Sequence, residues 1–453
     1  MRQSRPNVIV FFTDQQRWDT TGVHGCPLDL TPNFDRVAQE GTLAAHAYTC
    51  QPVCGPARSC FQTGQYATKT GCYRNGIPLP ADAKTLGHYF RDAGYRTGYI
   101  GKWHLADRDP VPADQRGGYE FWFGANALEH TSDAYDCVVY DNDERRVKLP
   151  GYRVDALTDA AIRFVDERKD EPFFLFVSYL EPHHQNHRDD YPAPAGYEQR
   201  YAGRWTPPDL QALGGSAPQH LPGYFGMVKR LDEAFGRLLD SLTSLGLTEN
   251  TVVAYTTDHG CHFKTRNGEY KRSCHDASLR LPLAITGPGF VGGGRRQEMV
   301  SLLDLPPTLL DAAGIPIPEA MQGRSLLGLL RGGGGATEEW PGEVFAQISE
   351  SQVGRCVRTH RWKYSVSAPD KHGWNDSGSD TYREEFLYDL LADPWELTNL
   401  VAHESHAAVR AHLRERLIAR MVEAGEPAPT VLPADAEARP AGQRRVGRDE
   451  IEA

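Results

Sequence analysis

Four short apolar runs, each followed at once by polar residues, restrict the fold of this chain more than any other feature. They are Asn7–Thr13 before Asp14-Gln15-Gln16, Thr97–Ile100 before Gly101-Lys102-Trp103-His104, Phe173–Leu180 before Glu181-Pro182-His183-His184, and Thr251–Thr257 before Asp258-His259-Gly260. Such runs indicate strands that are buried on both faces of a parallel sheet. In open parallel sheets the ligand crevice lies beyond the carboxyl ends of the strands. The sequence therefore predicts that the four polar clusters converge on one site.

Helical patterns separate these runs. Thr31-Pro32 begins a segment that continues to Glu40 before Gly41, and apolar residues recur at helical spacing from Phe225 to Leu242. Leu302 to Ala313 is a further predicted helix, followed by Gly314. Alternating strands and helices predict an α/β fold with a large mixed, mostly parallel sheet sandwiched by helices.

The chain is predicted to contain two units and a tail. A glycine run at 332–335 marks the boundary between a large N-terminal unit at 1–335 and a smaller C-terminal α+β unit at 336–428. In the smaller unit, strand patterns at Glu343–Ile348, Gly354–Arg358 and Trp362–Val366 predict a small antiparallel sheet, and a helix is expected from about Ser405 to Ala424. Residues 429–453 are rich in Pro, Ala, Arg and Glu, which predicts a loosely held tail.

Charge and cysteine content narrow the class of protein. The 453 residues include 49 basic and 60 acidic side chains, and the net charge of −11 argues against a nucleic acid partner. The N-terminus has no signal-peptide pattern, and its apolar run from Val8 to Phe12 is too short to span a bilayer, so we expect a cytoplasmic protein without membrane contact. Nine cysteines, an odd number, fit reduced thiols better than a disulfide framework.

The segment from Cys54 to Arg58 is the most informative short motif. Pro56 suits the first turn of a helix, which would place Cys54 near the helix start and Arg58 one turn later on the same face. A helix N-terminus beside an arginine is a favourable site for an anion. A buried structural cysteine is the alternative interpretation, because cysteines near helix starts are common.

Cys54, Pro56 and Arg58 match the CxPxR signature of the type I sulfatases, in which the cysteine is oxidised to formylglycine. The resemblance continues through NVIVFFTDQQ, TPNFDRVAQEG, GKWHL, TTDHG, the stretch from Lys271 to RLPL, and LYDLLADPWELTNL. It covers most of the chain. It implies the fold of the alkaline phosphatase superfamily and a hydrolase that releases sulfate from an organic ester. It also implies a formylglycine-generating enzyme as a partner during maturation.

The resemblance implies a divalent cation held by Asp14, Gln15, Asp258, His259 and the formylglycine formed from Cys54. Calcium is the usual ion of the family. Gln15 stands where many members of the family have a second Asp, so a neutral ligand replaces an anionic one. His259 stands where many members have Asn, so a softer nitrogen ligand replaces an oxygen ligand. Manganese is therefore the alternative ion.

The resemblance also assigns roles around the nucleophile. Lys102 and Lys271 would contact sulfate oxygens, Arg58 would stabilise the formylglycine, and His104 would assist its hydroxyl. His183, with Lys271, is a candidate acid for the leaving alcohol. Lys102 and His104 are two residues apart, so in an extended segment their side chains lie on one side and can bind one target together. A solvated lysine and a capping histidine are the alternative interpretation. The expected substrate is a sulfated sugar, on the likeness to bacterial carbohydrate sulfatases and on the histidine-rich loops.

Three other interpretations remain open on the sequence alone. The same superfamily contains phosphonate monoester and phosphodiester hydrolases that share the nucleophile and pair Asp-Gln with Asp-His. A non-catalytic anion binder would keep the fold but leave Cys54 unmodified. A zinc site at His183, His184 and His187 lacks completing ligands. The stretch Asn126–His130 is a candidate for the substrate-facing wall, and the sequence does not indicate an oligomeric state.

Overall fold

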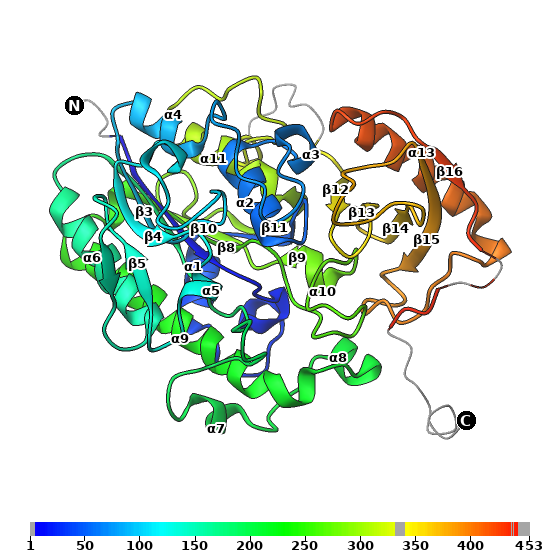
Figure 1. Ribbon diagram of the computed structural model, residues 1–453, viewed down its shortest axis with the longest axis horizontal. Helices are drawn as coiled ribbons and strands as arrows, with labels where there is room; N and C mark the ends of the chain where they lie inside the picture. Colours follow the sequence, from blue (N-terminus) through cyan, green and yellow to red (C-terminus); the bar gives the residue numbers. More distant parts are fainter. Residues whose placement is uncertain (1–4, 331–339, 436, 438, 443–453) are drawn as a thin grey trace.

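The computed structural model describes residues 5–330, 340–435, 437 and 439–442, and two sheets organise them (Figure 1). The large sheet has eleven strands in the order β11-β2-β10-β8-β1-β7-β3-β4-β5-β6, with β9 paired to β2. Its strands are β1 (Asn7–Thr13), β2 (Thr42–Tyr48), β3 (Arg96–Lys102), β4 (Phe121–Ala125), β5 (Val138–Tyr140), β6 (Arg146–Lys148), β7 (Phe173–Ser178), β8 (Thr251–Thr257), β9 (Arg280–Leu281), β10 (Ala284–Thr286) and β11 (Gly294–Ser301).

The four apolar runs form neighbouring parallel strands in the order β8-β1-β7-β3. Their carboxyl ends therefore lie along one edge of the sheet. β1 and β8 have the predicted bounds, β3 begins one residue earlier and continues to Lys102, and β7 ends at Ser178. Antiparallel pairing of β10, β5 and β6 makes the sheet mixed, and the predicted fold class is confirmed.

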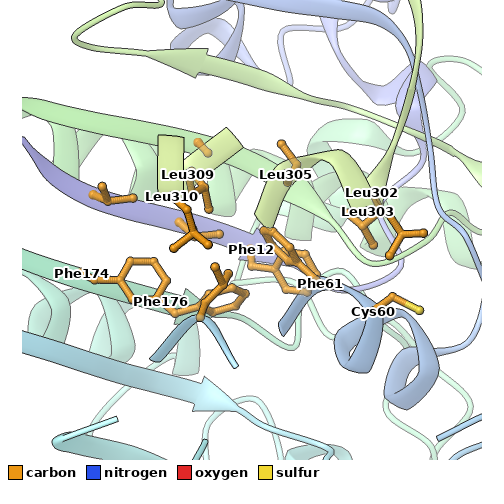
Figure 2. Packing of buried hydrophobic residues seen from close by; sticks show 14 of the residues in the cluster. Phe12, Cys60, Phe61, Phe174, Phe176, Leu302, Leu303, Leu305, Leu309 and Leu310 are labelled. Atoms are coloured by element: carbon orange, nitrogen blue, oxygen red, sulfur yellow. The ribbon is translucent and has the colours of Figure 1, made fainter. Parts of the chain in front are cut away.

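Helices cover both faces of this sheet because side chains of each strand alternate between the faces. Val8, Val10 and Phe12 of β1 pack against α2, α4 and α11, as Figure 2 shows for Phe12 beside Phe61 and Leu305. Ile9 and Phe11 pack on the other face against α1, α6 and α9. The helices of this unit are α1 (Pro32–Glu40), α2 (Cys54–Thr63), α3 (Ala67–Thr70), α4 (Leu86–Asp92), α5 (Leu128–Thr131), α6 (Arg153–Arg168), α7 (Tyr197–Tyr201), α8 (Pro208–Leu213), α9 (Ala217–Ser244), α10 (Asp276–Leu279), α11 (Leu305–Ala312) and α12 (Leu327–Leu330).

The predicted helices occur with modest changes of length. The first is α1, with the predicted bounds, and the second belongs to the longer helix α9. The third is a 3-10 turn at Leu302–Asp304 followed by α11. None of the described helices combines the length and the apolar character needed to cross a bilayer. All nine cysteines are buried and unpaired, as the odd count predicted.

The second sheet shares no strand pairing with the first, and it is covered by α13 (Ala407–Glu423) (Figure 1). Its order is β12 (Glu343–Ile348), β13 (Gly354–Thr359), β14 (Trp362–Ser367), β15 (Thr381–Asp389) and β16 (Thr430–Leu432). Leu413, Leu417 and Met421 of α13 are buried in the same apolar cluster as Val357 and Tyr364. The three predicted strands and the helix are present, whereas β15 and β16 were not predicted.

Part of the segment predicted to be a loose tail is held by the fold. β16 pairs in parallel with β15, and the carbonyl oxygen of the buried Ala441 accepts a hydrogen bond of 2.8 Å from Arg266. Backbone pairing is what overrides the polar composition here. The glycine run at 332–335, on which the unit boundary was predicted, lies outside the described residues.

Candidate active site

The ends of β1 and β8 bring Asp14, Gln15, Asp258 and His259 together. The two strands pair in parallel with Thr13 opposite Thr257, so the residues that follow are also neighbours. Asp258 Oδ1 accepts hydrogen bonds from the backbone nitrogens of Gln15 at 3.0 Å and His259 at 2.9 Å. Gln15 has a φ of 67°, a left-handed conformation that non-glycine residues adopt at a cost. The tight turn after β1 therefore fixes the Asp258 carboxylate.

Helix α2 begins at Cys54 and places the thiol in the same cluster. Cys54 Sγ lies 2.9 Å from Lys271 Nζ, 3.3 Å from His259 Nε2 and 3.7 Å from Asp14 Oδ1. The positive end of the helix dipole adds to the cationic surroundings of the thiol. The predicted helix start and the predicted anion site coincide at Cys54.

Arg58 and Lys102 both contact Asp14. Arg58 lies one turn into α2, and its Nη2 is 2.9 Å from Asp14 Oδ2, while Nη1 donates to Ser178 Oγ at 2.6 Å. Lys102, at the end of β3, is 2.8 Å from the same Asp14 oxygen and 2.9 Å from Glu129 Oε1. Both cations are buried, so the ion pairs act with little screening by water.

His183, Lys271 and His104 complete the cluster. Lys271 Nζ lies 2.9 Å from His183 Nε2 and 3.2 Å from Gln15 Oε1. His183 Nδ1 is 2.7 Å from the His184 carbonyl oxygen, which only a protonated Nδ1 can satisfy, so Nε2 accepts from Lys271. His104 Nδ1 lies 3.7 Å from Glu129 Oε1. The fold thus brings every site residue expected from the sequence into one cluster.

The surrounding cations control the protonation of the nucleophile position. Burial alone would raise the pKa of the Cys54 thiol, but Lys102, Lys271 and His259 lower it well below its ordinary value. Burial would likewise raise the pKa of Asp14, and the neighbouring Lys102 is the main group that holds it low. The site is therefore built to carry negative charge at these two positions.

Other groups of the site are shifted in different directions. Burial, and then the charge of Asp14, raise the pKa of Asp258 to about 6. Burial and the Lys271 ammonium lower the pKa of His183, which keeps its imidazole neutral at neutral pH. Perturbed groups of this kind are concentrated at functional sites.

The residues present fit a divalent cation. Asp14, Cys54, Asp258 and His259 each offer a donor atom, and these atoms all lie within 4.8 Å of one another. Asp258 Oδ2 is buried and has no hydrogen-bond partner, and its ion-pair contact with Arg58 Nε is 3.4 Å long, so the oxygen can still accept a cation. Two carboxylates and one imidazole suit calcium or manganese rather than a soft ion.

The three histidines considered for zinc do not form a site of their own. His184 stacks on His183 with ring centroids 4.4 Å apart, while His187 Nε2 is 3.0 Å from Asp133 Oδ1 on the surface. In residues 5–330, 340–435, 437 and 439–442, the group around Cys54 is the one set of three or more such side chains whose donor atoms lie this close.

Two residues of the cluster were missed on the sequence. Glu129 lies in the stretch Asn126–His130, which was expected to line the substrate side but not to contact Lys102. Ser178 is a polar residue at the end of an apolar run, and that interruption was a signal for a role at the edge of the sheet. Both sit at strand or helix ends whose pairing depends on the tertiary fold.

Comparison with known proteins identifies the family. The family model described as Sulfatase matches residues 6–315, and that described as N-sulphoglucosamine sulphohydrolase, C-terminal, matches residues 268–423. The chain is 28% identical to the Ulvan-active sulfatase of Formosa agariphila, over 93% of this chain and 82% of that protein. It is 32% identical to the uncharacterized sulfatase YidJ of Escherichia coli (93% and 88%) and 26% identical to the N-acetylglucosamine-6-O-sulfatase of Bacteroides thetaiotaomicron (91% and 86%).

Solved structures share the fold across nearly the whole chain. The sulfatase candidate yidJ of Bacteroides fragilis superposes with a TM-score of 0.82 at 23% identity, covering 94% of this chain and 97% of that one. The phosphonate monoester hydrolase of Agrobacterium radiobacter superposes with a TM-score of 0.66 at 23% identity, covering 93% and 96%. The Sulfatase model spans more than half of the chain, and the curated relatives agree with it. The chain therefore belongs to the sulfatase family of enzymes.

Proposed function

We propose that this enzyme releases sulfate from a carbohydrate sulfate ester, with formylglycine formed from Cys54 as the nucleophile. The observation that carries the proposal is the position of Cys54 Sγ, at the start of α2 and within 3.7 Å of Lys271, His259 and Asp14. Formylglycine would supply a hydrated aldehyde, and attack of one of its hydroxyls on sulfur would break the ester S–O bond and release the alcohol. A formylglycine-generating enzyme is then a required partner.

The metal proposal rests on the donor set described above. Asp14, Asp258 and His259 would hold the cation together with the modified residue 54. Gln15 is the fifth proposed ligand, and its Oε1 accepts a hydrogen bond from Lys271. The cation would act as a Lewis acid at the ester oxygens and lower the proton affinity of a nearby hydroxyl. Calcium is proposed first and manganese second.

The cations of the chain are proposed to bind the sulfate group. Lys271 Nζ contacts Cys54 Sγ directly, and Lys102 is held in the same buried cluster by Asp14 and Glu129. Because these ammonium groups are fixed before substrate arrives, they would stabilise developing negative charge without reorganisation. Arg58 contacts the same oxygen of Asp14 as Lys102 does and helps to keep that carboxylate in place.

Proton transfer is proposed to involve His183, Lys271 and His104. Lys271 donates to His183 Nε2, so the pair holds a proton beside position 54, where a leaving alcohol would need one. His104 also lowers the pKa of residue 54, after the larger effects of burial and the lysines, which fits a role in activating its hydroxyl.

A sugar sulfate is the proposed substrate class. The relative from Bacteroides thetaiotaomicron is an N-acetylglucosamine-6-O-sulfatase, and the chain covers 86% of its length. The competing proposal is phosphonate monoester hydrolysis, which is supported by the fold shared with the Agrobacterium radiobacter enzyme and by the Asp-Gln and Asp-His pairs. The cytoplasmic location also stays a prediction.

The test is turnover of matched aryl esters after co-expression with a formylglycine-generating enzyme. We expect release of sulfate from an aryl sulfate, and a loss of roughly 1,000-fold or more in Cys54→Ala. Cys60→Ala is the matched control, because Cys60 lies on the same helix but in the apolar core. Mass spectrometry of the peptide around residue 54 verifies the modification.

Each other outcome has a defined meaning. Faster hydrolysis of a phosphonate monoester than of the sulfate would replace the proposed reaction with the competing one. An unmodified thiol in protein from the native host, without turnover, would favour an anion binder. Removal of metal with a chelator should abolish turnover, and restoration by calcium or manganese identifies the ion.

A further inference from the structure

Glu129 is a carboxylate in the wall of a site that binds an anion. It is 2% exposed, its Oε1 lies 2.9 Å from Lys102 Nζ, and its Oε2 has no hydrogen-bond partner. A buried carboxylate oxygen without a partner is costly, and an acidic group beside a sulfate-binding lysine weakens the attraction for substrate. Glu129 is therefore expected to have a function other than increasing the affinity for substrate.

The fold holds Glu129 rigidly beside Lys102. Its backbone carbonyl oxygen accepts a hydrogen bond of 2.9 Å from Gln185 Nε2, and Gln185 also donates to the carbonyl oxygen of Ser132 at 2.6 Å. The loop after β7 thus fixes α5. Burial would raise the pKa of Glu129, but Lys102 and His104 lower it to about 2, so the side chain is ionised at neutral pH.

Apart from Cys54 and the histidines, the site contains as many buried cationic side chains as buried carboxylates. Three buried cations, Arg58, Lys102 and Lys271, face three buried carboxylates, Asp14, Asp258 and Glu129. Lys102 forms ion pairs with both Asp14 and Glu129. Without Glu129, the same ammonium group would present a larger positive field to the ester.

A sulfate monoester carries one negative charge, whereas a phosphate monoester carries close to two above its second pKa of about 6. The two groups are similar in shape, so charge is the property that separates them. Selectivity between similar ligands often comes from a repulsive contact with the wrong one. Glu129 is placed to repel an ester group with a second negative charge, because it contacts Lys102, which is proposed to bind the ester oxygens.

We infer that Glu129 determines specificity for singly charged ester groups and excludes dianionic phosphate monoesters. This inference rests on the proposed function, because it takes Lys102 as a ligand of the ester oxygens. According to this inference, Glu129 discriminates between ester groups by their charge and not by whether the central atom is sulfur or phosphorus. A phosphonate monoester, which carries one charge, should not be excluded by Glu129.

The test compares wild type with Glu129→Gln and Glu129→Asp on three aryl esters at about pH 8. The substrates are 4-nitrophenyl sulfate, 4-nitrophenyl phenylphosphonate and 4-nitrophenyl phosphate. In Glu129→Gln we expect the ratio of kcat/KM for phosphate to kcat/KM for sulfate to rise about tenfold or more. The ratio for phosphonate to sulfate should stay constant, and Glu129→Asp should resemble wild type.

A purely structural role gives a different result. If Glu129 only positions Lys102, Glu129→Gln lowers kcat/KM for all three esters by the same factor, and an unchanged ratio overturns the inference. The proposed function fails separately, if the modified wild type does not hydrolyse the sulfate. Where turnover is too slow, calorimetric binding of the same sulfate and phosphate to Cys54→Ala and to Cys54→Ala with Glu129→Gln gives the ratio. The inference is supported if Glu129→Gln raises the affinity for the phosphate ester relative to that for the sulfate ester. Equal changes in the two affinities overturn it.

Discussion

Two buried ionic clusters of similar composition perform different tasks in this enzyme. The catalytic cluster contains Asp14, Asp258, Glu129, Arg58 and Lys102 at the edge of the large sheet. The interunit cluster contains Asp276 of α10, Arg358 of β13, Lys363 of β14 and Glu396, and it joins the large unit to the smaller one.

The clusters differ in how completely their carboxylates are hydrogen-bonded. In the interunit cluster, Lys363 contacts one oxygen of Asp276 and one of Glu396, while Arg358 and a backbone nitrogen satisfy the others. In the catalytic cluster, Glu129 Oε2 has no hydrogen bond, and Asp258 Oδ2 has none apart from an ion-pair contact of 3.4 Å with Arg58 Nε. The carboxylate oxygens of the interunit cluster are all paired, whereas the catalytic cluster keeps carboxylate oxygens that can interact with a cation or with substrate.

The largest effect on stability is expected from breaking the interunit cluster. Asp276→Asn leaves Arg358 without its carboxylate and Lys363 with only one, both in a buried setting. Removing one partner of a buried ion pair costs about 3–5 kcal/mol of unfolding free energy. Chemical denaturation measures this loss, and kcat of the folded fraction should stay near that of wild type.

Asp166→Asn is the control for this prediction, because Asp166 forms an exposed pair with Lys169. Exposed pairs contribute little, so the denaturation midpoint should not move. A stability of Asp276→Asn equal to that of this control would show that the interunit cluster does not hold the two units together.

A smaller effect, of opposite sign, is expected in the catalytic cluster. Without metal, Asp258 is buried beside Asp14, and burial together with that like charge raises its pKa to about 6. Asp258→Asn should therefore stabilise the chelated protein near neutral pH by on the order of 1–2 kcal/mol. The same variant should lose the rise in Tm that calcium or manganese gives to wild type.

Thermal unfolding of the variant and of wild type, with and without a chelator, measures the stability of the chelated proteins and the rise in Tm on metal binding. Thr256→Val serves as the control, because Thr256 is a buried neighbour on β8 outside the ligand set. A chelated Asp258→Asn protein less stable than chelated wild type would mean that Asp258 is held by its two backbone amides more strongly than it is repelled by Asp14.

The sequence predicted the parts of the site that depend on strand ends and not those that depend on distant pairing. Asp14 and Asp258 could be found because β1 and β8 are continuous apolar runs, and a run that ends in polar residues marks the sheet edge. Glu129 could not be assigned to Lys102, since the contact requires β3, β4 and α5 to be arranged in three dimensions.

The smaller sheet also contains a strand that local sequence could not predict. β12, β13 and β14 follow one another along the chain and were predicted, whereas β16 pairs with β15 across about forty residues that include α13. A three-residue strand has too little pattern to be recognised, and its partner supplies the reason that it is extended. Local sequence therefore indicates the elements that are stable through their own apolar pattern.

The smallest predicted effect is a pH dependence of opposite sign in the two clusters. The pKa of Asp258 is raised from 3.8 to about 6, so its contribution to metal-free stability is complete below about pH 4 and is lost as pH rises through 6. Burial would raise the pKa of Asp276, but Arg358 and Lys363 hold it low, so its contribution is present above about pH 4 and is lost as pH falls.

Each group changes the unfolding free energy by up to about 1.4 kcal/mol per pH unit within its own range. Urea denaturation of the chelated protein between about pH 3 and 7 should therefore show less loss toward neutral pH in Asp258→Asn and less loss toward acid in Asp276→Asn. Added metal should remove the first slope in wild type and leave the second, because a cation bound at Asp258 keeps that carboxylate ionised. Identical slopes in both variants would refute the distinction, since the two clusters would then respond to protons as one.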